Sequence, residues 1–103
     1  MVYAAQPQPA ACAHGAALAL RLLKAMAHRE RLAILVLLAA GPLCVGELER
    51  QVGMRQAALS QQLAKLRADG IVDAERQGRH KLYRIQSAQV LAALRSLGLL
   101  LGG

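Results

Sequence analysis

Apolar residues recur with helical spacing through the first part of the chain. Leucines after His14 return every three or four positions as far as Met26, which predicts a first helix. The strongly apolar run over residues 31–40 predicts a second helix. It is expected to end at Gly41 and Pro42, because glycine suits a helix C-terminal cap and proline cannot continue the turn.

Two shorter helices are predicted over residues 45–52 and 56–68, each followed closely by a glycine. The connection between them is short enough for a helix-turn-helix. Leu59, Leu63 and Leu66 in the second of these helices predict one core-facing stripe. At about 100° per residue, the opposite face carries small residues, amides and one lysine: Ala57, Ala58, Gln61, Ala64 and Lys65, with Ser60 on its flank.

The apolar period changes to two after Gly70. Segments over 71–76 and 80–85 alternate and contain β-branched or aromatic residues, so they predict a hairpin. Ser87 can cap a last helix. This order of elements is mainly α with a small β-hairpin, as in a winged helix-turn-helix. The last helix has an apolar face with nothing after it to cover it, formed by Val90, Leu91, Leu94, Leu97 and Leu101.

The chain of 103 residues is near the size of a single domain. Residues 1–13 are expected to be a flexible N-terminal arm, and residues 14–103 to form one domain. Apolar residues make up 55% of the chain and aromatic residues 2%. A protein this small has difficulty covering so many leucines alone, which predicts a homodimer.

The charge balance points to a polyanionic partner. Lys and Arg number 13 against 6 Asp and Glu, giving a formal net charge of +7, and duplex DNA is the first candidate. The longest apolar run, over residues 32–40, is too short to span a bilayer. The N-terminus does not resemble a secretion signal. We therefore expect a soluble, cytoplasmic protein with no membrane partner.

The polar face of the 56–68 helix has the chemistry of a base-reading surface. Alanine permits close approach to thymine methyl groups, and glutamine can pair with adenine through two hydrogen bonds. Gln56, Ser60 and Gln61 are the base-reading candidates. The alternative is an ordinary solvated helix face, although such faces more often carry Glu and Lys.

The hairpin adds positive charge directly after this helix. Four basic residues and no acidic one lie between positions 76 and 84, and backbone phosphates are their natural partners. The alternative is a charged edge strand that prevents aggregation. The residues expected at DNA are Arg55, Gln56, Ser60, Gln61, Lys65, Arg76, Arg79, His80 and Lys81, with Arg84 as the fourth basic residue of the hairpin.

Other function classes fit less well. No paired-carboxylate cleft, glycine-rich phosphate loop or Ser/His/Asp set indicates an enzyme. A winged helix can also serve as a protein-interaction module without sequence-specific DNA binding. Salt dependence of binding would distinguish that alternative from a DNA-binding regulator.

The chain resembles the ArsR/SmtB group of bacterial metal- and thiol-responsive repressors over most of its length. The resemblance is carried by LLKAMAHRERLAIL at 22–35, LCVGELERQVG at 43–53, QAALSQQLAKLRADGIV at 56–72 and RQGRHKLYRI at 76–85. It implies a homodimer formed through the first and last helices. It also implies that an inducer lowers affinity for operator DNA and releases repression. One departure is Arg29, where a proline is common.

The resemblance also implies a candidate sensor. Cys44 matches a cysteine used by thiophilic-metal sensors, and Glu47 falls on an Asp position of that site. Cys12 and His14 in the N-terminal arm could complete a set suited to Zn, Cd or Pb. Gly46 stands where arsenic sensors have a second cysteine, which weakens an As site. No metal is expected to be required for the fold.

Two other interpretations of the cysteines remain open. Cys44 can be a buried small apolar residue, and Cys12 with Cys44 can form a redox or persulfide switch. The dithiol sensors of the family have cysteines in the second and last helices. Val36 occupies the first of those positions, and the last helix has none. The metal site of some members at the start of the last helix also lacks its donors, since Ser87, Ala88 and Gln89 stand there.

Overall fold

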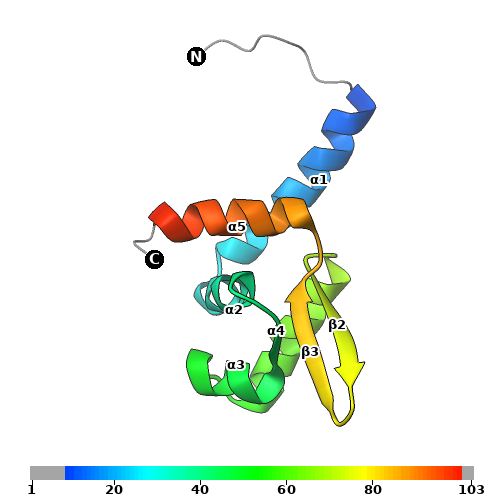
Figure 1. Cartoon of the computed structure of the whole chain (residues 1–103). Helices are drawn as coiled ribbons and strands as arrows, with labels where there is room; N and C mark the ends of the chain where they lie inside the picture. The colour runs from blue at the N-terminus through cyan, green and yellow to red at the C-terminus, as the bar shows by residue number, and fades with distance from the viewer. Residues whose placement is uncertain (1–8, 101–103) are drawn as a thin grey trace.

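The computed structural model describes the backbone over residues 9–100 and the side chains over residues 16–97. Helices α1 and α5 lie at one end, and α3, α4 and the hairpin lie at the other, with α2 between them (Figure 1). The fold is that of a winged helix-turn-helix. The elements are α1 (Pro9–Met26), α2 (Arg29–Ala39), β1 (Leu43–Cys44), α3 (Val45–Val52), α4 (Gln56–Ala68), β2 (Val72–Gln77), β3 (His80–Ile85) and α5 (Ala88–Leu100).

The leucine stripe of α4 forms part of the core. Leu59, Leu63 and Leu66 are each 0% exposed, which confirms the face assignment made from their spacing. They pack in a cluster with residues of α2, α3, the sheet and α5. No polar or charged residue is buried among the described part of the chain. The core is therefore held by apolar packing, and polar groups are left for the surface.

The end of α4 is fixed by a glycine. Gly70 has φ 75°, a backbone conformation that residues with a Cβ rarely adopt. Its N–H donates to Arg67 O, and the next N–H, of Ile71, donates to Leu66 O, both at 3.0 Å. This is the Schellman pattern, and Ile71 and Leu66 are both fully buried beside it. The chain therefore leaves α4 in a defined direction and enters the wing.

The wing consists of β2 and β3, two strands of a three-stranded sheet in the order β1-β3-β2. Gly78, with φ 61°, starts the two-residue turn between β2 and β3, as a type II′ turn requires. This hairpin was predicted from the sequence, whereas β1 was not. Leu43 and Cys44 pair with Tyr83 and Leu82, and a two-residue strand is too short to show an alternating pattern.

Of the two helices at the other end, α1 begins earlier than expected and α5 has the predicted cap. Helix α1 already begins at Pro9, whereas residues 1–13 were expected to form a flexible arm. Ser87 does cap α5, because its hydroxyl oxygen accepts the N–H groups of Gln89 and Val90 at 3.1 and 3.3 Å. Val90 and Leu94 are 2% and 1% exposed. Part of the α5 face expected to need a partner is therefore covered by the same chain.

Candidate nucleic-acid interface

The face of α4 opposite the leucine stripe is open to solvent. Gln61 and Lys65 lie there, and Gln56 is at the first position of the helix, after Arg55 at the N-cap. No acidic residue occurs anywhere in α4. A side chain that enters the major groove must be free to contact base edges, and these are. The exposed residues of the predicted set on or next to α4 are Arg55, Gln56, Ser60, Gln61 and Lys65.

The wing places two cations directly opposite each other. Arg76 on β2 is the cross-strand partner of Lys81 on β3, and both side chains are exposed. Like charges at opposed positions destabilise an antiparallel pair. The Lys81 ammonium also lies 5.7 Å from the centre of the Tyr83 ring, a cation–π distance. A phosphate beside this pair would relieve the repulsion between them.

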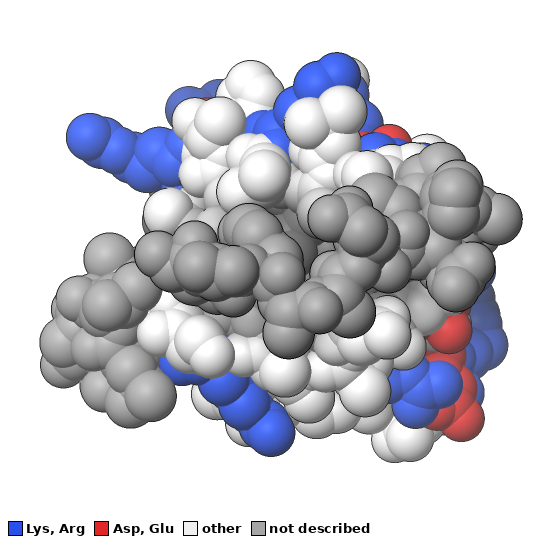
Figure 2. Space-filling view, turned by 90° about the horizontal axis from the view of Figure 1, so that it is seen from above, with Lys and Arg blue, Asp and Glu red and all other residues white. Residues whose placement is uncertain are grey.

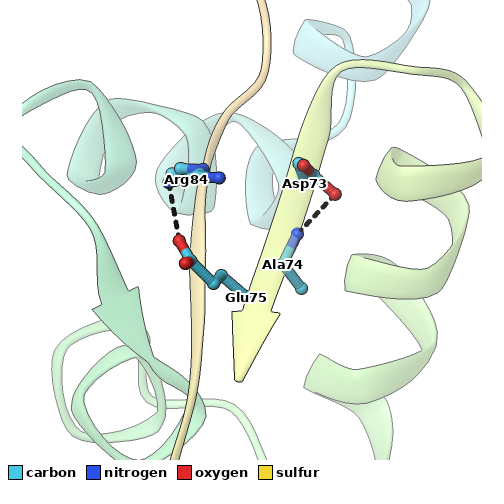
Figure 3. Close-up of polar contacts among 4 residues, drawn as sticks. All are labelled: Asp73, Ala74, Glu75 and Arg84. Carbon is cyan, nitrogen blue, oxygen red and sulfur yellow. Dashed lines mark hydrogen bonds and ion pairs between the residues drawn. The ribbon is translucent and has the colours of Figure 1, made fainter. Parts of the chain in front are cut away.

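Arg84 does not belong to this group of free cations. Its guanidinium forms an ion pair with Glu75 on β2 at 2.9 Å (Figure 3). In the same view, the carboxylate of Asp73 accepts the N–H of Ala74 at 2.8 Å. From the sequence, Arg84 is grouped with the phosphate-binding residues, because no acidic residue separates it from Arg76. The sheet register brings Glu75 to it from the neighbouring strand.

A hollow of about 460 Å³ joins the start of α4 to the tip of the wing. Gln56 lies on its α4 side, and Arg79, His80 and Lys81 lie on its wing side. The tertiary structure thus brings together four of the predicted residues from two elements. Arg50 of α3 also lines the hollow. Arg50 was not predicted from the sequence, because along the chain it is only one charged residue of a polar helix.

The sensor residues that the structure describes have a structural role at the start of α3. Cys44 is the N-cap of α3, and its N–H donates to Glu47 Oε1 at 3.1 Å. This hydrogen bond, with the Cys44 side chain, lowers the pKa of Glu47 from its ordinary value, and the charges of Arg50 and His80 act in the same direction. The reciprocal contact of an N-cap and the third helical residue is a capping box.

The described residues alone do not form a metal site. Among them, no group of three or more His, Cys, Asp and Glu side chains is close enough to hold an ion. Cys44 is a half-buried free thiol. The side chains of Cys12 and His14 lie outside the described residues. Within the described segment, no helix combines the length and the apolar character needed to cross a membrane.

Comparison with known proteins gives a consistent result. The model of the family described as "Bacterial regulatory protein, arsR family" matches residues 28–74. A "Biofilm growth-associated repressor" of Agrobacterium fabrum is 45% identical over 76 residues, which are 71% of this chain and 65% of that protein. The "Transcriptional activator HlyU" of Vibrio cholerae is 43% identical over 76 residues, 74% of this chain and 70% of that protein.

Solved structures agree with the sequence matches. The structure of HlyU from Vibrio cholerae has a TM-score of 0.78 at 42% identity and covers 84% of this chain and 94% of its own. A domain of Mb0332 from Mycobacterium bovis has a TM-score of 0.75 at 30% identity, covering 97% of this chain and 91% of its own. It is described as a homodimeric winged helix-turn-helix DNA-binding domain of a possible ArsR-family transcriptional regulator.

Proposed function

Because this chain belongs to the ArsR family and is therefore a DNA-binding transcriptional regulator rather than an enzyme, we propose that it represses transcription as a homodimer bound to operator DNA. Helix α4 enters the major groove, and the wing of β2 and β3 contacts the backbone beside it. An inducer lowers this affinity. The protein acts in the cytoplasm, where the operator is accessible.

One observation carries the DNA-binding geometry. The exposed face of α4 has small residues and amides and no acidic group, and Gln56 at the start of this helix shares a hollow with the basic wing tip. We assign base reading to Gln61 and Gln56, and phosphate contacts to Arg76, Arg79 and Lys81. Base contacts give specificity and phosphate contacts give affinity, so the two groups are expected to behave differently under mutation.

The dimer is proposed to form through α1 and α5. Leu20 and Leu23 of α1 are 56% and 60% exposed, unusually high for large apolar side chains. Seen from this end of the molecule, the described surface is mainly uncharged, with Lys, Arg and a few Asp or Glu side chains at its rim (Figure 2). A two-fold axis here would present two α4 helices to successive major grooves, about 34 Å apart. Leu23→Glu should give a monomer in sedimentation analysis.

The inducer is proposed to act at Cys44, with Glu47 and, from the N-terminal segment, Cys12 and His14. Cys44 lines the hollow that Gln56 and the wing tip share, so a group bound to its sulfur would lie beside the DNA-facing surface. A metal ion bound by Cys44 and Glu47 would have to displace the hydrogen bond from Cys44 N–H. Titration of the reduced protein and of Cys44→Ser with Zn, Cd, Pb and As(III), followed by thiolate absorbance, tests this site.

Fluorescence anisotropy with Gln61→Ala tests the base-reading assignment. The variant should lose about 1–3 kcal/mol of specific binding to DNA from upstream of its own gene, because a bidentate base contact contributes that much discrimination. Binding to a shuffled duplex should be nearly unchanged. Gln51→Ala is the matched control, since Gln51 is also an exposed glutamine but lines a hollow with α2 and β1 residues. Equal losses on both duplexes would remove Gln61 from the base-reading set.

A further inference from the structure

Two arginines outside the helix-turn-helix make hydrogen bonds to α4. Arg31 Nε on α2 donates to Gln62 Oε1 at 2.6 Å in a half-buried position. Arg21 Nε on α1 donates to the backbone carbonyl of Asp69, the C-cap of α4, at 3.1 Å. Within the described part of the chain, no other side-chain hydrogen bond reaches α4 or its C-cap from another element.

Gln62 and its neighbour Gln61 have different surroundings although they are adjacent in sequence. At about 100° per residue, Gln61 points nearly opposite the leucine stripe, whereas Gln62 lies on the flank of the stripe. Gln61 is exposed and Gln62 is half-buried. The Gln62 carbonyl is already engaged by Arg31. Gln62 therefore connects α4 to the body of the protein, and Gln61 faces away from it.

The hydrogen bond between Arg31 and Gln62 restricts the rotation of α4 about its own axis, which apolar packing alone restricts less. The leucine stripe is attracted to the core without a preferred direction, whereas a hydrogen bond has a narrow range of distance and angle. A roll of α4 by about 20° would move an atom about 6 Å from the helix axis by about 2 Å. That displacement is enough to lose a two-hydrogen-bond contact with a base edge.

The contact of Arg21 holds the C-terminal end of the helix, whereas Gln62 lies at its middle. A cation beside the carbonyls at a helix C-terminus also interacts favourably with the helix dipole. Arg21 belongs to α1, the helix proposed to form the dimer. The orientation of α4 is thus connected through Arg21 to the helix that sets the spacing of the two subunits.

We propose that Arg31 and Arg21 are positioning residues that hold α4 at the roll and tilt required for Gln56, Ser60 and Gln61 to meet base edges. The proposal rests on the operator binding proposed above. Neither arginine needs to contact DNA. Their effect is on specificity, because they act through the placement of the base-reading face.

The binding test uses the tightest duplex selected from a randomised library and a shuffled duplex of the same composition. Arg31→Met and Gln62→Met should each lose about ten-fold in affinity for the selected duplex, with the shuffled duplex and the salt dependence unchanged. The double variant should lose no more than either single variant, because both remove one bond. Gln62→Glu keeps the acceptor and should retain affinity. Arg21→Gln should show a smaller specific loss, about three-fold.

Arg29→Met is the matched control, because Arg29 is exposed on the same helix and makes no side-chain hydrogen bond within the described part of the chain. Gln62→Met removes the same bond from the acceptor side, which covers the case in which Arg31→Met does not fold. Equal weakening on both duplexes, with a salt slope lower by about 0.9, would show that Arg31 contacts phosphate and would overturn the proposal. Multiplicative losses in the double variant would also overturn it.

A second measurement needs no DNA. Residual dipolar couplings should show that α4 changes orientation relative to α2 in Arg31→Met and Gln62→Met, and keeps its orientation in Arg29→Met. An unchanged orientation would overturn the positioning role. If the wild-type protein does not distinguish the selected duplex from the shuffled one, operator binding fails, and the couplings still decide whether the two arginines position α4.

Discussion

Replacing Arg76 by Gln is expected to stabilise the free protein while weakening its binding to DNA. Arg76 lies directly opposite Lys81 in the wing, and both are exposed. Without DNA the two charges repel each other. In the proposed complex with DNA, the same two charges would face phosphates. Arg76→Gln is therefore expected to increase the stability of the free protein and to decrease its affinity for DNA.

The size of the stability change follows from the cross-strand geometry. Opposed side-chain pairs in antiparallel sheets contribute about 0.2–1 kcal/mol. Arg76→Gln should therefore raise the free energy of unfolding by an amount in this range, about 0.2–1 kcal/mol. Lys81→Gln relieves the same repulsion but loses the contact with the Tyr83 ring at 5.7 Å. An exposed cation–π contact contributes about 0.5–1 kcal/mol, and this variant should be close to neutral.

The change in DNA binding follows from counterion release. Each phosphate contact contributes about 0.9 to the slope of log affinity against log salt. Losing one contact should therefore lower affinity about five-fold at about 0.15 M salt. The Arg76→Gln and Lys81→Gln double variant should lose about 30-fold, on specific and shuffled duplexes alike.

Anisotropy titrations across a salt series give the slope, and urea denaturation gives the free energy of unfolding. Arg84→Gln is the charge-matched control. Arg84 is paired with Glu75, and the two side chains are 48% and 51% exposed, so this variant should leave the slope unchanged and alter stability by at most about 1 kcal/mol. An Arg76→Gln protein with a wild-type slope, or with lower stability, would refute the reasoning.

Three further predictions concern stability. Gly70→Ala should cost about 1 kcal/mol in urea denaturation, because a Cβ there has open space but the backbone has φ 75°; no loss would contradict the cap assignment. Ser87→Ala should cost about 0.5–2 kcal/mol by removing the α5 cap, and an unchanged urea midpoint would exclude it. Because the pKa of Glu47 is lowered in the folded protein, its ionised carboxylate stabilises the fold at pH values above the ordinary pKa of 4.5. This stabilisation is lost as the pH falls through the pKa of the folded state. Glu47→Gln should therefore differ from wild type at neutral pH and converge with it in acid, and a constant difference would contradict this.

The sequence by itself determined the elements that local signals define. The bounds of α3 and α4, the leucine stripe of α4 and the cap at Ser87 could all be predicted. Helical periodicity, capping chemistry and glycine at helix ends act within a few residues, so they are visible in one dimension. The exposed residues of α4 follow from the same helical periodicity, whereas the wing residues were predicted from their positive charge.

Only the tertiary structure decided which residues meet across the chain. It paired Arg84 with Glu75 and joined Leu43 and Cys44 to β3. It also brought Gln62 into a hydrogen bond with Arg31, while the neighbouring Gln61 is exposed. These contacts depend on sheet register and on how helices cross. A pattern of apolar and polar positions specifies which side of a helix or strand faces inward. It contains no distance between side chains on different elements, and that distance decides whether a charged or polar group is already engaged or is available to DNA.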